Sequence, residues 1–213
     1  MTRTRNTTGD VVSFARAWLR APLRTGAIAP SSPELARHMV FSAAPAKSGP
    51  VIELGPGTGI VTDCLLAAGI EERDLVLIEL DPDFAANLKR KYPQAKVIET
   101  DAFAFVRNQA HTGETAAAII SSLPLYVYPK VKRQKLCEDA LRALGPGGRL
   151  VQFTYGPVSP ISPPAHIDAF RSRRIWGNLP PAVVWTYQTK TFRAHEPGPL
   201  NIRDKVETRE SAQ

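Results

Sequence analysis

The sequence contains little cysteine and no histidine cluster, and both absences limit what the protein can be. Cys64 and Cys137 are its only cysteines, and each lies in a segment that is expected to be helical. Two cysteines so far apart build neither a disulfide framework nor a metal cluster. The four histidines are also scattered, without the spacing of metal ligands. We therefore expect no metal ion and interpret both cysteines as small buried thiols.

The sequence also lacks an apolar run of the ~18 residues that a membrane-spanning helix requires. The longest candidate, residues 116–127, contains two serines and a proline and is better explained by a buried strand. The basic start, MTRTRNTTGD, is not followed by the apolar core of a signal peptide. These features predict a cytoplasmic location.

Charge is the first feature that points to a partner. The chain has 27 lysines and arginines against 20 acidic residues, which gives a formal net charge of +7. A basic surface of this kind attracts polyanions, which include nucleic acids and the headgroups of anionic lipids. The sign of the charge alone does not distinguish between these partners.

From residue 50 onward, short β-branched runs alternate with segments of helical character. Strands are expected at residues 50–54, 75–80, 96–100, 116–123, 149–154 and 182–190. Helices are expected at residues 60–68, 82–92, 103–109 and 129–144, and the last of them ends at the turn signal Gly145-Pro146-Gly147-Gly148. Strands that alternate with helices predict an α/β fold with a doubly wound, mostly parallel sheet.

Residues 1–45 lie outside this alternation and are predicted to form an N-terminal helical segment that precedes a domain of residues 46–213. Asp10 can cap an amphipathic helix over residues 11–20. A second helix is expected to begin near Pro33. Ser31 and Glu34 have the spacing of a capping box, whereas Ser32 offers an alternative cap directly before the proline.

The segment from Glu53 to Gly59 carries the strongest chemical signal. An apolar strand leads into three glycines at alternate positions, Gly55, Gly57 and Gly59, and a helix is expected to begin at Ile60. Glycines allow a sharp turn and a close approach to a ligand, and a helix N-terminus offers free N–H groups. Such a loop typically lies under a ribose or a phosphate. The spacing Glu-x-Gly-x-Gly-x-Gly differs from the dehydrogenase fingerprint and resembles the first motif of the Rossmann-like class I methyltransferases.

This resemblance implies S-adenosyl-L-methionine as the cofactor. Glu79 ends the second strand, where a carboxylate can accept hydrogen bonds from both ribose hydroxyls; the alternative is a solvated loop charge. Asp81 is the rival for the ribose, but its place before a proline suggests a helix cap. Asp101 follows the third strand, where the resemblance implies a contact with the adenine amino group; the alternative is a plain helix cap. Glu53 either helps to hold the cofactor's ammonium group or orients the loop. The predicted cofactor-binding residues are Glu53, Gly55, Gly57, Thr58, Gly59, Glu79, Asp101 and Ala102.

The fourth strand ends in Ser121-Ser122-Leu123-Pro124-Leu125-Tyr126, where amino-methyltransferases bring the acceptor nitrogen to the cofactor. The rRNA adenine dimethylases carry Asn-Leu-Pro-Tyr here, so Ser122 replaces the asparagine and Leu125 replaces the stacking tyrosine. A flipped nucleobase needs an aromatic face and polar partners, so a small aliphatic amine fits better. The predicted acceptor-site residues are Ser122, Leu123, Pro124, Tyr126 and Tyr155.

An aliphatic amine must lose a proton before it can attack, because its ordinary pKa is about 10.4. The site must therefore lower that pKa or supply a base. Each methylation also makes the product cation more alkylated, and aromatic faces attract such cations. The available aromatic residues are Tyr126, Tyr128, Tyr155, Trp176, Trp185 and Tyr187. Most are expected in the core or the sheet, with Tyr126 and Tyr155 the strongest candidates for the acceptor pocket.

Several longer segments resemble one family, the bacterial phospholipid N-methyltransferases. The similar segments are residues 18–32, 53–59, 122–125, 151–156 and 176–182, so the resemblance extends over most of the chain. One departure is Gly177, where the family pattern suggests a bulkier polar residue. The family implies methylation of phosphatidylethanolamine in up to three steps to phosphatidylcholine, at the inner face of the cytoplasmic membrane.

The family also implies peripheral binding to anionic membranes through the first N-terminal helix. An apolar side and a basic side of that helix suit the headgroup boundary. The residues predicted to bind the membrane are Phe14, Arg16, Trp18, Leu19, Arg20 and Arg24. The alternative is an ordinary helix that packs on the domain. The basic run of residues 130–135 is either a solvated helix face or an extension of the membrane-facing surface.

Two other functions remain as alternatives. An rRNA adenine N6-dimethyltransferase would explain the glycine loop and the positive charge, but it would normally carry the asparagine–tyrosine motif and a C-terminal helical domain. A catalytically silent lipid-binding module would explain the charge without the cofactor motif. We expect phosphatidylethanolamine, its methylated forms and an anionic membrane surface as partners, without nucleic acid and without an obligate protein partner.

Overall fold

The computed structural model describes residues 31–45 and 49–190. The helix predicted over residues 11–20 lies outside the described residues, and so do all the residues predicted to bind a membrane through it. In the part of the chain that the structure describes, no helix has the length and apolar character needed to cross a bilayer.

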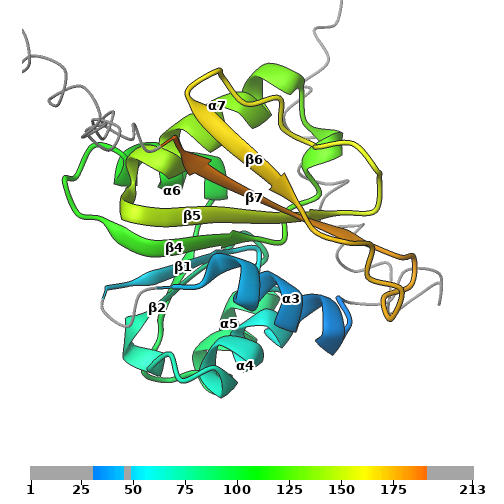
Figure 1. The fold of residues 1–213 in the computed structure, drawn as a ribbon. Coiled ribbons are helices and arrows are strands. Elements are labelled where there is room, and N and C mark those ends of the chain that lie inside the picture. The colour runs from blue at the N-terminus through cyan, green and yellow to red at the C-terminus, as the bar shows by residue number, and fades with distance from the viewer. Residues whose placement is uncertain (1–30, 46–48, 191–213) are drawn as a thin grey trace, which may run out of the picture.

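The centre of the fold is a seven-stranded sheet with the strand order β3-β2-β1-β4-β5-β7-β6 (Figure 1). The strands are β1 Val51–Leu54, β2 Leu75–Glu79, β3 Lys96–Glu99, β4 Ala116–Ser121, β5 Leu144–Thr154, β6 Ile167–Arg171 and β7 Val183–Thr189. Strands β1 to β5 pair in parallel, and β7 is antiparallel to both of its neighbours, β5 and β6. The mostly parallel, doubly wound sheet predicted from the sequence is therefore confirmed.

Helices cover both faces of this sheet. They are α3 Pro33–Ala43, α4 Ile60–Ala67, α5 Pro82–Lys91, α6 Ala102–Gln109 and α7 Lys130–Arg142, with 3-10 turns at Glu72–Asp74 and Leu125–Val127. One apolar cluster joins α3, α4 and α5 to one face of the sheet, and a second cluster joins α6 and α7 to the other. Figure 1 shows these two layers on opposite sides of the strands.

The side chains of β1 alternate between the two faces of the sheet, so this strand packs against both helical layers. Val51 belongs to the α3–α5 cluster, whereas Ile52 and Leu54 belong to the α6–α7 cluster. Successive side chains of a strand point to opposite faces, so Glu53 lies on the same face as Val51. There the Glu53 carboxylate meets Thr62 of α4. A charged residue inside an apolar strand therefore faces a helix that offers it a hydrogen bond.

Two helix caps account for the places where α3 and α5 begin. Ser32 is the N-cap of α3, because its hydroxyl accepts a hydrogen bond from the Leu35 N–H at 3.1 Å. Asp81 caps α5 and accepts from two backbone N–H groups of the first turn. Both caps satisfy donors that have no partner inside the helix, which is why these helices begin at their prolines.

The structure differs from the prediction at β5 and β6. Strand β5 begins at Leu144 instead of residue 149, because residues 145–148 form an irregularity between the pairs Ala116–Leu144 and Ala118–Arg149. The glycine–proline signal marks a bulge within a strand here, as well as the end of the preceding helix. Strand β6 was not predicted, because its segment is short and contains no β-branched run. The structure shows that most of its residues are exposed.

Candidate functional site

Four loops meet at the carboxyl edge of the parallel strands. The glycine loop follows β1, Glu79 ends β2, Asp101 follows β3, and Ser122 follows β4. Parallel strands bring their carboxyl ends to a single edge, where α/β sheets bind their ligands. Residues far apart in the sequence are therefore brought together.

A pocket opens at this edge, and we call it the glycine-loop pocket. Its lining residues are Gly55, Ile78, Glu79, Leu80, Asp81, Thr100, Asp101, Ala102, Phe103, Leu123, Pro124 and Tyr128. Of the predicted cofactor-binding residues, four line the pocket, Gly55, Glu79, Asp101 and Ala102. Glu53 lies beneath the loop, and Thr58 is exposed at its tip.

The loop itself is built from glycines in left-handed conformations. Gly57 has φ 55° and Gly59 has φ 84°, a region that residues with a Cβ rarely adopt. A Cβ at Gly57 would meet no atom within 4 Å, so open space lies above it. A Cβ at Gly59 would instead lie 2.5 Å from the Tyr92 hydroxyl. One glycine therefore leaves room for a ligand, and the other allows the loop to pack on the protein.

Glu79 fixes the loop from the neighbouring strand. Its Oε2 accepts a hydrogen bond from the Gly57 N–H at 3.0 Å. Its Oε1 accepts from the N–H groups of Leu80 and Asp81 at 2.8 and 2.9 Å. Burial raises the pKa of Glu79, and these three backbone hydrogen bonds oppose the shift. A carboxylate has about four acceptor positions, so Glu79 can still accept a further donor from the pocket.

Asp101 is a helix cap that also lines the pocket, so the predicted contact with an adenine amino group stays a prediction. Its side chain caps α6 by accepting a hydrogen bond from the Ala104 N–H at 2.9 Å, and the residue also lines the pocket. Beside it, the rings of Phe103 and Tyr128 lie with centroids 4.6 Å apart, and the Lys132 ammonium lies over both. These rings form an aromatic wall that the sequence reading had not assigned to the site.

Glu53 is a buried acid with one satisfied oxygen. Its Oε2 accepts a hydrogen bond from the Thr62 hydroxyl at 2.6 Å. Its Oε1 has no hydrogen-bond partner among the described residues. Burial raises the pKa of Glu53 to about 7, although the hydrogen bond from Thr62 opposes the shift. A buried oxygen of this kind is suited to a cationic donor.

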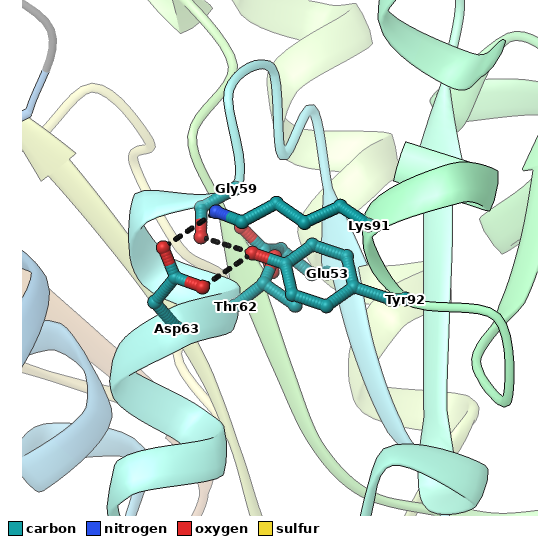
Figure 2. A network of polar contacts seen from close by, with 6 residues as sticks. All are labelled: Glu53, Gly59, Thr62, Asp63, Lys91 and Tyr92. Carbon is teal, nitrogen blue, oxygen red and sulfur yellow. Dashed lines mark hydrogen bonds and ion pairs between the residues drawn. The ribbon is translucent and has the colours of Figure 1, made fainter. Parts of the chain in front are cut away.

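The same network ties α4 to the end of α5 (Figure 2). The Tyr92 hydroxyl lies 2.8 Å from the Gly59 carbonyl oxygen and 2.7 Å from Asp63 Oδ1. The Lys91 ammonium lies 2.6 Å from Asp63 Oδ2. These contacts hold the N-terminus of α4, and with it the glycine loop, against the α5 layer. None of Asp63, Lys91 and Tyr92 had been assigned to the site from the sequence.

A second pocket adjoins the first at the ends of β4 and β5, and we call it the strand-end pocket. It has a volume of about 270 Å³ and is lined by Leu123, Pro124, Leu125, Tyr126, Val127, Phe153, Thr154, Tyr155 and Pro160. Leu123 and Pro124 line both pockets and so form the wall between them. Tyr126 and Tyr155 both line the strand-end pocket, whereas Ser122 lines neither.

Gln152 is a structural part of this wall that the sequence reading did not single out. It is 1% exposed, and its amide nitrogen donates to the carbonyl oxygens of Leu123 and Phe153 at 3.0 and 2.7 Å. The side chain therefore ties the loop after β4 to β5. The available signal was a polar residue inside the apolar run of β5, where a buried amide needs hydrogen-bond partners. The amide nitrogen has two, whereas Oε1 has none among the described residues.

Comparisons with known proteins identify the family. Residues 31–130 match the family model described as ribosomal RNA adenine dimethylase. An ornithine lipid N-methyltransferase of Singulisphaera acidiphila is 30% identical over 152 residues, which span 70% of this chain and 79% of that protein. The chain belongs to the class I S-adenosylmethionine-dependent methyltransferases. A ribosomal RNA small subunit methyltransferase A of Maridesulfovibrio salexigens is 41% identical over 71 residues, but these span only 33% of this chain and 26% of that protein.

Solved methyltransferase structures share the fold at low sequence identity. TrmN from Thermus thermophilus superposes with a TM-score of 0.59 at 16% identity, covering 83% of this chain and 53% of TrmN. The glycopeptide N-methyltransferase MtfA, solved with S-adenosyl-L-homocysteine, gives a TM-score of 0.56 at 15% identity and covers 89% of this chain and all of the other. S-adenosyl-L-methionine, the cofactor of the family, fits the residues present. The space above Gly57, the buried carboxylates and the aromatic wall together suit a nucleoside that carries a cationic amino acid.

The contact between Gly59 and Tyr92 predicts a large loss of stability for Gly59→Ala. The substitution combines a left-handed φ, costing about 1–2 kcal/mol, with overpacking against the ring, costing about 1–3 kcal/mol. Gly113→Ala is the matched control, because Gly113 has φ 78° but a Cβ there would meet nothing within 4 Å. Urea denaturation of both variants measures the difference. Equal losses would contradict the assigned contact.

The raised pKa of Glu53 predicts a pH-dependent effect of Glu53→Gln. The carboxyl has a pKa of about 7 when folded and an ordinary value of 4.5, so the folded state retains a proton that the unfolded state releases between these values. The stability of the parent protein therefore falls as pH rises through this window, by up to roughly 3 kcal/mol, and glutamine removes that loss.

Thermal denaturation near pH 5 and near pH 8 tests this expectation. The melting temperature of Glu53→Gln relative to the parent protein should rise between the two conditions, by several degrees. Glu114→Gln is the control, because Glu114 is exposed and should show no such trend. A difference between Glu53→Gln and the parent that is the same at both pH values would show that Glu53 is not the titrating group.

Proposed function

We propose that this protein transfers methyl groups from S-adenosyl-L-methionine to the headgroup amine of phosphatidylethanolamine, in up to three steps to phosphatidylcholine. The observation that carries the proposal is the strand-end pocket. It adjoins the glycine-loop pocket, with which it shares the lining residues Leu123 and Pro124, and it is lined mainly by apolar and aromatic side chains. Among the described residues that line it, there is no acid, lysine, arginine or histidine. Such a pocket suits an aliphatic amine on a lipid better than a polar, planar base.

The cofactor-pocket residues would hold S-adenosyl-L-methionine in defined positions. Glu79 would accept hydrogen bonds from the ribose hydroxyls, and Asp101 would accept one from the adenine amino group beside the aromatic wall. Glu53, buried beneath the glycine loop, would face the ammonium of the methionine part. Bound in this way, the cofactor supplies an electrophilic methyl group on a sulfonium. Leu123 and Pro124, which line both pockets, would flank the point where the methyl group meets the acceptor amine.

The apolar lining would also lower the free energy needed to deprotonate the amine, whose proton passes to bulk water before the amine attacks. Desolvation disfavours a charged ammonium and therefore lowers its pKa, so less free energy is needed to present the free amine. Tyr155 has its own pKa raised by burial, with a hydrogen bond to Asn178 opposing the shift, so its hydroxyl stays neutral. The rings of Tyr126 and Tyr155 can stabilise the alkylated cation that forms. As the N–C bond forms and the C–S bond breaks, the neutral amine becomes a cation that these faces attract.

The pattern of similarity supports a lipid acceptor. The ornithine lipid N-methyltransferase is similar along 70% of the chain, whereas the rRNA dimethylase model ends at residue 130. The part of the strand-end pocket lined by residues between Phe153 and Pro160 lies C-terminal to residue 130, outside the matched segment. The resemblance to RNA enzymes therefore covers the cofactor half and only part of the acceptor pocket.

Dimethylation of adenine in ribosomal RNA is the second candidate, and the family match and the net charge of +7 favour it. The side chain at position 125 argues against it. Leu125, which stands where the dimethylases carry a tyrosine, is 3% exposed and lines the strand-end pocket. An aliphatic side chain offers a base no ring to stack on.

A methyl-transfer assay separates the two functions. The protein is incubated with methyl-labelled S-adenosyl-L-methionine and either vesicles of phosphatidylethanolamine with an anionic lipid or ribosomal RNA. We expect label in the lipid extract, with chromatography reporting one, two or three added methyl groups. Label that appears only in RNA would refute the lipid acceptor and support the second candidate.

Calorimetric titration with S-adenosyl-L-methionine tests the cofactor site. Gly57→Val should abolish detectable binding, because its side chain fills the open space above the loop. Gly147→Val is the matched control, since Gly147 also has a left-handed φ and free surroundings but lies in the β5 bulge. Glu79→Ala should weaken binding about 10-fold or more through the lost ribose and loop hydrogen bonds. Parent-like affinity in Gly57→Val and Glu79→Ala would show that the cofactor binds elsewhere.

A further inference from the structure

The loop between β6 and β7, residues 172–182, exposes two large apolar side chains. Trp176 and Leu179 are each 75% exposed. Arg171 ends β6, and Arg173 and Arg174 follow it within the loop, with no acidic residue between positions 171 and 182. The Arg174 guanidinium lies 5.9 Å from the centre of the Trp176 ring. Adjacent arginines and exposed apolar side chains give this loop an amphipathic tip.

The exposure of this tip is built into the loop. Ile175 and Ala182 pair through two backbone hydrogen bonds, at 2.8 and 3.1 Å, and both side chains are buried. Asn178 is 1% exposed, and its amide nitrogen donates to the Pro180 carbonyl oxygen at 2.7 Å. Buried anchors therefore alternate with the two outward side chains. Burying Trp176 and Leu179 would stabilise the folded state by about 2 kcal/mol or more, yet the fold leaves both side chains in water. This exposure indicates a function for them.

The loop lies at the edge of the sheet that contains the site. Strand β7 begins at Val183, which pairs with Thr154, a residue of the strand-end pocket. Asn178 also forms a hydrogen bond with Tyr155 of the same pocket. Its Oδ1 accepts a hydrogen bond from the Ser32 N–H at 2.8 Å, which ties the loop to the start of α3. Figure 1 shows the loop, in orange, projecting beyond the sheet near that end of α3.

We propose that the β6–β7 loop docks on an anionic phospholipid bilayer, with Trp176 and Leu179 in the headgroup boundary and Arg171, Arg173 and Arg174 on lipid phosphates. The inference rests on the proposed lipid substrate and adds a surface that presents the strand-end pocket to the bilayer. Tryptophan favours the membrane interface, and each arginine near an anionic surface strengthens binding. Leu179 favours a bilayer over RNA, because an aliphatic side chain neither stacks on a base nor forms a hydrogen bond with it.

Vesicle binding by the full chain tests the loop. With vesicles of phosphatidylcholine and phosphatidylglycerol, Trp176→Ala with Leu179→Ala should weaken binding about 10-fold or more. Phe41→Ala is the matched control, because Phe41 is 83% exposed on α3 and should leave binding unchanged. The triple replacement of Arg171, Arg173 and Arg174 by glutamine should have a similarly large effect.

A second control separates local charge from net charge. Lys89→Gln, Arg90→Gln and Arg107→Gln together also remove three positive charges, but from exposed positions on α5 and α6. This variant should lose much less binding than the loop variant, since electrostatic attraction to lipid acts within a Debye length of the surface. Equal losses in the two triple variants would overturn the assignment of the loop.

Three further measurements make the result independent of folding and of catalysis. A variant that keeps Trp176 as its only tryptophan should show fluorescence quenching by brominated acyl chains, and absence of quenching would overturn the proposal. Loss of RNA binding with unchanged vesicle binding in the loop variants would also overturn it and indicate a nucleic-acid surface.

Methylation of a short-chain, monomeric phosphatidylethanolamine should stay at parent level in the loop variants. If the parent protein itself methylates no such lipid, the proposed function fails, whereas vesicle binding still decides the role of the loop.

Discussion

The carboxylate of Glu79 joins the end of β2 to the glycine loop that follows β1, and the geometry of the cofactor site depends on this junction. Three backbone N–H groups donate to its two oxygens, one of them from Gly57. Burying a carboxylate is costly unless hydrogen bonds replace its water, and here backbone donors replace it almost completely. The acid is therefore rigid, ionisable and already aimed at the pocket before any ligand arrives.

Glu53 shows the opposite arrangement one strand away. It is fully buried, but only one of its oxygens accepts a hydrogen bond, from Thr62. Burial accordingly raises the pKa of Glu53 to about 7. A fold that needed only stability would place an apolar residue there, because an unpaired buried oxygen is destabilising. The cost is understandable if a cationic ligand supplies the missing partner, so that stability is lost in the free protein and recovered on binding.

The sequence predicted which residues meet at the glycine-loop pocket better than which residues meet at the strand-end pocket, for a physical reason. The elements from β1 to β4 follow one another with short connections, and their parallel order sends Gly55, Glu79 and Asp101 to one edge without further information. The strand-end pocket instead combines residues 123–127 with residues 153–160, and the tie between them is the side chain of Gln152. Such a contact depends on strand register, which local patterns do not reveal. For the same reason Trp176, expected in the core or the sheet, turned out to be exposed on a loop that a long-range bridge positions.

The division between the two halves also explains why the family resemblance is divided. Every member of the family must hold the same nucleoside, so the loop, the strand-end acids and their spacing stay under a common constraint. The acceptor differs from enzyme to enzyme, and the strand-end pocket, where we propose that it binds, combines residues after β4 with β5 and the segment after it. For a lipid acceptor the chemistry imposes one more condition: the amine cannot leave the headgroup layer to reach a buried pocket in solution. The pocket must therefore lie at the membrane surface.

Asn178 contacts Tyr155 in the pocket wall, lies in the β6–β7 loop beside its exposed tip, and contacts Ser32 at the start of α3. Under our proposals, one buried side chain thus connects the loop that docks on the bilayer to a residue that would hold the amine.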